Sequence, residues 1–105
     1  MTFRQEKLNV QLTKIIAEFL RNEFGASPLI SVIHVLIAHG LREARVRIAV
    51  FPEKEEKRVL SLLRKKRAEL NRYLALHTKM KYLPSVTFEI DSGEKNRKRI
   101  EELLQ

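Results

Sequence analysis

Four consecutive basic residues are the most distinctive chemical feature of this sequence: Arg64, Lys65, Lys66 and Arg67. Guanidinium and ammonium groups bind phosphate oxygens through charge-assisted hydrogen bonds, so such a run is typical of a site for a polyanion. Successive residues of an α-helix are about 100° apart, and four consecutive cations therefore cannot share one helical face. They must wrap a helix or crowd a bend, which suits a curved phosphate backbone better than a flat acidic protein surface.

The run lies within a strongly basic segment, residues 57–81. The chain has 21 Lys and Arg residues against 13 Asp and Glu, which gives a net charge of +8. The segment holds nine of the basic residues and one acid, Glu69, so the rest of the chain is balanced at twelve of each sign. Charge confined to one segment indicates a surface for nucleic acid, and a solubilising surface is the alternative.

The predicted RNA contacts extend beyond the run in both directions. They are Arg64, Lys65, Lys66, Arg67, Arg72, Lys79 and Lys81, with Arg42, Arg45 and Arg47 as a second group. For the second group, the solvated face of a strand explains the charges equally well. Tyr73 and Tyr82 could stack on unpaired bases, although Tyr73 lies at the edge of an apolar stripe, which favours a place in the core.

The other side chains that could do chemistry are not arranged for catalysis or metal binding. None of the three His residues, at positions 34, 39 and 77, lies on a predicted helix with a second His or a carboxylate four residues away, so we expect them to be packed or solvent-facing. The start of a helix explains the carboxylates at 53, 55 and 56. The absence of Cys excludes thiolate ligands and disulfides. We therefore predict that the protein is not an enzyme and uses no metal, cofactor or small-molecule substrate.

Length and composition favour a single cytoplasmic domain, residues 1–105. With 44% apolar residues the chain can build a modest core. No apolar run approaches the roughly 20 residues that cross a bilayer, so we expect no membrane association. The charged start of the sequence argues against a secretory signal, and the absence of Cys is compatible with a reducing cytosol. We expect a monomer.

The apolar pattern predicts the elements that position these residues. A first amphipathic helix ends at Gly25 and carries a stripe of Leu8, Leu12, Ile15, Ile16, Phe19 and Leu20. Residues 29–37 are rich in β-branched side chains and predict a strand, and a short turn at 38–42 favours antiparallel pairing with the next strand. In that second strand Arg45 and Arg47 alternate with apolar Ala44, Val46, Ile48 and Val50. One sheet face should therefore pack under helices while the other faces water.

A second helical region follows Pro52 and contains the basic run. Lys66 lies on the same side as its apolar stripe, which is Val59, Leu63, Leu70 and Leu74. A Lys that faces a core is unfavourable, so we predict a bend or break near residues 65–68 and two consecutive helices. A straight helix, with Lys66 reaching water at the edge of the stripe, is the alternative.

The pattern after this region completes an α+β fold. Pro84 ends the helix, and a third strand alternates polar residues with Val86, Phe88 and Ile90. A short C-terminal helix follows, capped by Asp91 and Ser92, with an apolar face of Ile100, Leu103 and Leu104. The predicted order is α-β-β-α-α-β with this last helix added, and we expect a three-stranded sheet with helices on one face.

This order resembles a type II KH domain, although the Gly-x-x-Gly loop with which a standard KH domain grips nucleic acid is absent. Three stretches resemble the ribosome-binding factor A family, which has the KH order without that loop. They are Gly40–Val50, similar to the family's turn into its second strand, Met80–Asp91, similar to its entry into the third strand, and Arg99–Leu104, similar to its closing helix. The likeness extends in order from about Phe3 to Leu104.

The chain departs from the family's pattern at two places. The family usually has an Ala-x-Gly kink where the loop would be, and this chain has Lys66-Arg67-Ala68. The family's Ser-Pro-Asp before the second strand is Ala38-His39-Gly40 here. The predicted bend therefore coincides with the family's kink but lacks its glycine.

The resemblance implies a role in late maturation of the small (30S) ribosomal subunit. The protein would bind 16S rRNA, assist its processing and folding, and leave before translation begins; the family is also linked to growth in the cold. Two other functions stay open, a general KH-like RNA- or DNA-binding module with a non-ribosomal target and an interaction protein whose basic helix docks on an acidic partner. Salt dependence and competition by RNA distinguish the last from the others.

Overall fold

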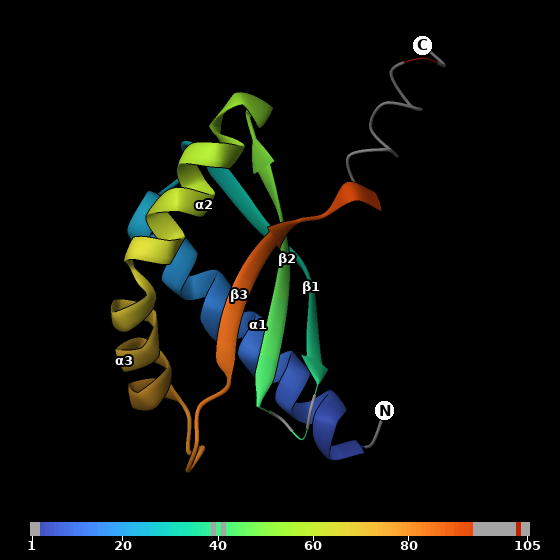
Figure 1. Ribbon diagram of the computed structural model, residues 1–105, viewed down its shortest axis with the longest axis vertical. Helices are drawn as coiled ribbons and strands as arrows, with labels where there is room; N and C mark the ends of the chain where they lie inside the picture. Colours follow the sequence, from blue (N-terminus) through green and yellow to red (C-terminus); the bar gives the residue numbers. More distant parts are fainter. Residues whose placement is uncertain (1–2, 39, 41, 94–102, 104–105) are drawn as a thin grey trace.

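Three strands form one sheet against which the helices pack in the computed structural model, which describes residues 3–38, 40, 42–93 and 103 (Figure 1). The elements are α1 (Phe3–Phe24), β1 (Leu29–Ala38), β2 (Glu43–Phe51), a 3-10 turn η1 (Glu53–Glu55), α2 (Glu56–Lys65), α3 (Arg67–His77) and β3 (Ser85–Ile90). The predicted α+β class and the type II KH order α-β-β-α-α-β are confirmed. Among these described residues, no helix is long and apolar enough to cross a membrane.

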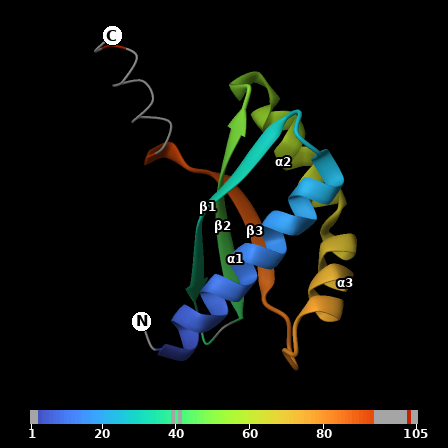
Figure 2. The same cartoon turned by 180° about the vertical axis from the view of Figure 1, so that it is seen from behind.

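Helix α1 crosses one face of the sheet, as Figure 2 shows from behind. The predicted stripe holds it there, with buried Leu12, Ile15, Ile16, Phe19 and Leu20 in the core. A polar contact adds to this packing, because Asn9 Nδ2 donates a 2.7 Å hydrogen bond to the carbonyl of Val35 in β1. The helix ends at Phe24, and Gly25 closes it as predicted. The φ of Gly25 is +69°, which favours glycine, and its amide donates to the Arg21 carbonyl at 2.8 Å.

Strand β2 is central, with β1 antiparallel on one side and β3 parallel on the other. The predicted antiparallel pairing is confirmed, and a bulge between Val32 and His34 interrupts its register. The predicted alternation is confirmed too, since the buried side chains of β2 are Ala44, Val46, Ile48 and Val50. Parallel strands need a crossover connection, and α2 and α3 provide it. The crossover brings the basic run beside β3, which lies at the edge of the sheet next to both helices (Figure 1).

The predicted break in the second helical region is confirmed, with Lys66 as the single residue between α2 and α3. Its φ of −93° and ψ of +14° lie in the bridge region, which a residue other than glycine can occupy. The Lys66 amide donates to the Leu62 carbonyl at 3.0 Å, and the Lys66 carbonyl accepts from the Leu70 amide at 2.9 Å. Because backbone hydrogen bonds continue across the bend, the chain can turn here without glycine. The apolar stripe also continues through it, with buried Val59, Leu63, Leu70 and Leu74.

The structure differs in detail from the predictions at the start of α2 and adds a contact after β3. Residues 53–55 form the 3-10 turn η1 before α2, instead of its first α-helical turn, and such tighter turns are common at helix N-termini. After β3, Asp91 Oδ1 accepts a 2.9 Å hydrogen bond from the Gly93 amide, which is the contact expected of a residue that caps a helix. Most of the predicted C-terminal helix, including Ile100 and Leu104, lies outside the described residues.

Candidate nucleic-acid interface

A groove separates α2 and α3 from β3, and part of the basic run forms its rim. We call this cavity, which has a volume of about 320 Å³, the helix–strand groove; it is lined by Leu60, Leu63, Arg64, Arg67, Leu70, Val86, Thr87 and Phe88. Its floor is apolar because Leu63, Leu70 and Val86 are buried members of the core. Arg64 and Arg67 are exposed. A floor of this kind beneath two guanidinium groups can accept bases as well as phosphates, since guanidinium planes both stack and form bidentate hydrogen bonds.

The bend decides which residues of the run reach the groove. Arg64 lies in the last turn of α2 and Arg67 begins α3, so the two arginines approach the groove from either side of Lys66. Arg67 Nη2 makes a long, 3.5 Å hydrogen bond to the Val86 carbonyl, which keeps the guanidinium over β3. The Arg64 side chain forms no hydrogen bond or ion pair with any residue that the structure describes. A ligand can therefore bind Arg64 without displacing a described partner, and at Arg67 it competes only with this one long contact.

Lys66 is directed toward α1 instead. Its Nζ lies 2.8 Å from Glu23 Oε2 and 3.7 Å from Glu69 Oε2. The hydrogen bond with Glu23 raises the pKa of Lys66 above its ordinary value of 10.5. Two carboxylates compensate the charge, and the side chain is only 28% exposed. Lys66 thus ties the bend to α1, so a contact with RNA, as predicted from the sequence, would have to compete with Glu23.

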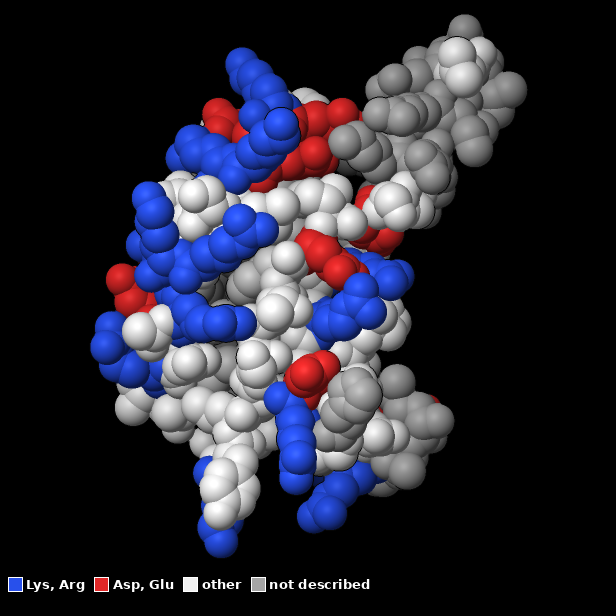
Figure 3. All heavy atoms as spheres, in the orientation of Figure 1, with Lys and Arg blue, Asp and Glu red and all other residues white. Residues whose placement is uncertain are grey.

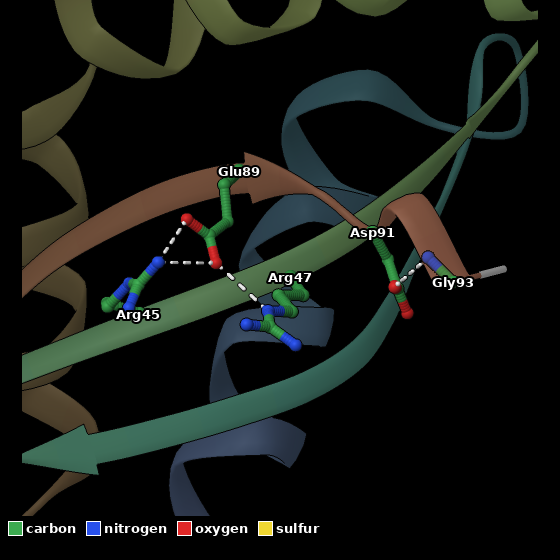
Figure 4. A network of polar contacts seen from close by, with 5 residues as sticks. All are labelled: Arg45, Arg47, Glu89, Asp91 and Gly93. Atoms are coloured by element: carbon green, nitrogen blue, oxygen red, sulfur yellow. Dashed lines mark hydrogen bonds and ion pairs between the residues drawn. The ribbon is translucent and has the colours of Figure 1, made fainter. Parts of the chain in front are cut away.

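Arg45 and Arg47 are also held by a carboxylate, on the sheet face opposite α1 (Figure 4). Arg45 Nη2 lies 2.9 Å from Glu89 Oε2, and Arg47 Nε lies 2.9 Å from Glu89 Oε1. The parallel register explains the cluster, because it places Arg47 directly opposite Glu89. The hydrogen bonds from Arg45 and Arg47 lower the pKa of Glu89 below its ordinary value of 4.5, so the carboxylate stays charged. This pair of predicted contacts is therefore partly neutralised, and neither arginine lines the helix–strand groove.

Two further hollows continue the groove along the molecule. The Pro84 hollow, of about 440 Å³, is lined by Arg42, Arg67, Asn71 and residues 83–86. It shares Arg67 and Val86 with the helix–strand groove. It shares Arg42 and Leu83 with a third hollow, at the N-terminal end of α1, to which Lys79 and Lys81 also belong. We call the three joined hollows the basic track.

The space-filling view agrees with this arrangement. Lys and Arg side chains gather over α2 and α3 and again at the lower end of the molecule (Figure 3). Lys65 and Arg72, the remaining predicted contacts, are exposed on α2 and α3. The structure therefore brings Arg64, Arg67, Arg42, Lys79 and Lys81 to one track, and it separates Lys66, Arg45 and Arg47 from that track.

The two tyrosines have different environments. The Tyr73 ring stacks on His77, with 4.0 Å between centroids, and lies 5.6 Å from the Phe19 ring. Tyr73 is thus partly buried and packs against the core, in line with the expected core position. Tyr82, in contrast, is 78% exposed, and Lys81 Nζ lies 5.6 Å from the centre of its ring. Only Tyr82 of the two presents a free aromatic surface.

The structure describes two of the three His residues, His34 and His77. His34 is exposed on β1, and His77 Nδ1 lies 2.8 Å from the Tyr73 carbonyl, while His39 is outside the described residues. Within the described part of the chain, no three His, Asp or Glu side chains gather as metal ligands.

Two basic residues of the track were missed by the sequence-based prediction. Arg4 and Lys7 of α1 line the third hollow. They lie outside the basic segment, in a helix that carries charges of both signs. Only the spacing of the two residues indicates in the sequence that they act together. Residues i and i+3 of a helix share a face, so Arg4 and Lys7 form a local cationic pair.

A model of the family described as ribosome-binding factor A matches residues 4–104. The match covers nearly the whole chain and all the described elements. The chain belongs to the ribosome-binding factor A family. The resemblance expected from the sequence is thereby confirmed.

Relatives in the ribosome-binding factor A family are similar along most of their length. The protein of Coxiella burnetii is 30% identical over 107 residues, which cover 100% of this chain and 90% of the relative. The protein of Bdellovibrio bacteriovorus is 28% identical over 104 residues, 96% of this chain and 78% of the relative.

Solved structures of the ribosome-binding factor A family share the fold. The crystal structure of the Thermus thermophilus protein gives a TM-score of 0.71 at 24% identity and covers 81% of this chain and 92% of its own. The solution structure of a Thermotoga maritima protein described as a ribosome-binding factor A gives 0.71 at 16% identity, with 83% and 86% covered. A Thermus thermophilus homology model fitted into the cryo-EM map of a 30S complex gives 0.68 at 24% identity, with 79% and 90% covered.

Proposed function

We propose that the protein binds the small (30S) ribosomal subunit through its 16S rRNA and that the basic track is the contact surface. The observation that carries the proposal is the helix–strand groove, with its apolar floor and exposed guanidinium rim, in a member of a family named for ribosome binding. The Thermus thermophilus relative described in a 30S complex supports the same target.

The residues of the track divide the work by chemistry. Arg64, Arg67 and Arg42 contact phosphates along the basic track, and Lys79 and Lys81 strengthen the field within it. Lys65 and Arg72 add to this field from the exposed surfaces of α2 and α3. Guanidinium groups give directional contacts, whereas lysines act as mobile point charges. Lys66, Arg45 and Arg47 contribute less because Glu23 and Glu89 already hold them.

The proposed mechanism uses binding energy and breaks no bond. A surface that fits one RNA conformation better than others shifts the population toward that conformation by the difference in affinity. This activity suits a factor that assists the processing and folding of rRNA during late maturation of the subunit. It also suits a factor that is needed for growth in the cold. Family membership supports ribosome binding, and we include the maturation role, action in the cytoplasm and a monomeric state in the proposal.

Co-sedimentation with purified small subunits at low salt tests the proposal. We expect the wild-type protein to sediment with immature subunits. The double variant Arg64→Ala/Arg67→Ala should bind at least about tenfold more weakly, because each charge-assisted hydrogen bond is worth about 1.5–3 kcal/mol. The matched control is Lys14→Ala/Arg21→Ala, which removes the same charge from two exposed residues of α1 that lie outside the track.

Two results would contradict the proposal. If the wild-type protein stays in the supernatant at low salt, the small subunit is not its target. If unrelated RNAs bind as tightly as immature subunits, the protein is instead a general KH-like RNA- or DNA-binding module with another target.

A further inference from the structure

The third hollow of the basic track is a pocket of its own, with a volume of about 660 Å³. We call it the Tyr82 pocket. Three segments far apart in the sequence build its basic rim: Arg4 and Lys7 come from α1, Arg42 precedes β2, and Lys79 and Lys81 come from the connection between α3 and β3. Figure 3 shows Lys and Arg side chains on both sides of the notch at the lower end of the molecule. The fold itself therefore concentrates cations here, away from the sequence run.

No described residue that lines the Tyr82 pocket is acidic. None of the five cations forms an ion pair with a residue in the described part of the chain. This contrasts with Lys66, Arg45 and Arg47, which carboxylates hold. Like charges that converge without compensation repel one another and attract an anion, so the rim suits a ligand with more than one phosphate.

The interior of the pocket is apolar and includes an exposed aromatic ring. Leu8, Met80 and Leu83 are partly buried and pack against the core, which makes them a fixed floor. Tyr82 is 78% exposed, and Lys81 Nζ lies 5.6 Å from its ring centre. A ring this exposed adds little to the core, and its free face can stack on a base. Pockets for small ligands measure about 300–1,000 Å³, so the volume suits a nucleotide.

We propose that the Tyr82 pocket receives an unpaired nucleotide of the RNA, with the base stacked on Tyr82 and the adjacent phosphates held by the basic rim. The inference rests on the proposed function only in taking RNA as the ligand. A duplex keeps its bases stacked on one another, so it can contact the rim but cannot place a base on Tyr82. The pocket therefore selects single-stranded over double-stranded RNA.

A fluorescent variant reports this stacking directly. The chain contains no Trp, so Tyr82→Trp introduces the only indole. Titration with a single-stranded oligouridylate of about 10 nucleotides, within the size range of single-strand sites, should quench the indole fluorescence. The dissociation constant from quenching should equal the one measured by the fluorescence anisotropy of labelled RNA. A blunt-ended RNA duplex, which has no unpaired nucleotide, should bind with little quenching.

Affinities of the other Tyr82 variants give a second readout. Because base–aromatic stacking is worth about 1–3 kcal/mol per base, Tyr82→Ala should weaken binding of the oligouridylate about 5- to 150-fold, with a much smaller effect on the duplex. Tyr82→Phe keeps the ring and should recover most of the affinity. The matched control is Phe51→Ala, because Phe51 is also an exposed aromatic residue, at 64%, and lies at the end of β2 outside the basic track.

The possible outcomes separate this inference from the proposed function. If Tyr82→Ala binds the oligouridylate as the wild type does, or if the indole is not quenched, the pocket does not stack a base. The pocket also does not stack a base if Tyr82→Ala weakens binding of the single strand and of the duplex by the same factor. Subunit binding that depends on Arg64 and Arg67 would still support the proposed function in each case. Loss of subunit binding alone would reject the ribosomal target, while selective quenching by the single strand would keep the pocket.

Discussion

Glu89 holds the two arginines on the open face of the sheet and compensates part of their charge. It accepts hydrogen bonds from both guanidinium groups and stays charged because these bonds lower its pKa below 4.5. Glu23 has a similar effect on Lys66, whose charge it compensates at the bend. Arg64 has no such partner among the described residues and is free to bind a phosphate. Cations of the same type in this chain therefore differ in whether a carboxylate already compensates their charge.

The variant Glu89→Gln tests this effect on stability. The two ion pairs are exposed at the surface, so we expect the free energy of unfolding at pH 7 to fall by no more than about 1 kcal/mol. Urea denaturation measures this change. The matched control is Glu18→Gln, since Glu18 forms no ion pair with a described residue. A control that loses as much stability as Glu89→Gln would mean that the cluster has no specific effect.

The lowered pKa of Glu89 also predicts the sign of a pH effect. A carboxylate whose pKa is lower in the folded than in the unfolded state stabilises the fold above the unfolded value, and this contribution is lost as pH falls through the folded value. The contribution of Glu89 should therefore be complete above about pH 5.5 and disappear as pH falls below 4.5. Urea titrations from pH 6 to pH 3 should show that the difference between wild type and Glu89→Gln shrinks with acidification. A difference that grows would contradict the assignment.

The α2–α3 bend places two cations of the basic run, Arg64 and Arg67, at the rim of the helix–strand groove. Its place could be predicted because a Lys on an apolar stripe conflicts with a straight helix. The ion pair between Lys66 and Glu23 could not be predicted, because Glu23 lies 43 residues before Lys66 and no local pattern connects them. The pairing of Glu89 with Arg45 and Arg47 was hidden for the same reason, since it depends on the register of β3 beside β2. The order of helices and strands, in contrast, follows from local periodicity, which each segment carries by itself.

Packing beneath the bend can be tested with Leu70→Ala. Leu70 is 3% exposed and forms part of both the core and the groove floor, so its truncation should cost about 2–5 kcal/mol of unfolding free energy. Leu76→Ala is the matched control in the same helix, because Leu76 is 82% exposed and should change stability by no more than about 0.5 kcal/mol. Chemical denaturation measures both. Similar losses in the two variants would mean that α3 does not pack as described.

At the scale of the whole molecule, the basic track joins surfaces that the sequence keeps apart. It leads from the helix–strand groove past Pro84 to the Tyr82 pocket, and it includes residues from the first helix that segment composition did not indicate. The long dimension of the molecule is 48 Å. A single-stranded RNA that follows the track would contact phosphates at several places at once, so its binding should depend steeply on salt.

The salt dependence of RNA binding measures how many of these contacts form. Each phosphate contact contributes about 0.7 to the slope of log affinity against log salt for a single strand. Replacing Arg42, Arg64 and Arg67 together by Ala should therefore reduce the magnitude of the slope by about two. The matched control replaces exposed Lys14, Arg21 and Lys54, which removes the same net charge from outside the track. If both triple variants reduce the slope equally, net charge and not the track governs binding.

The parallel pairing of β3 with β2 has a consequence for synthesis. The chain must continue through α2 and α3 before β3 exists, because β3 begins at Ser85. A nascent chain that has emerged only as far as His77 already contains α1, β1 and β2, but one wall of the helix–strand groove is still missing. At roughly 5–20 residues per second, translation supplies that wall a second or so later. If the groove binds RNA as proposed, a chain that has not yet added this strand to the sheet would lack one side of the contact surface.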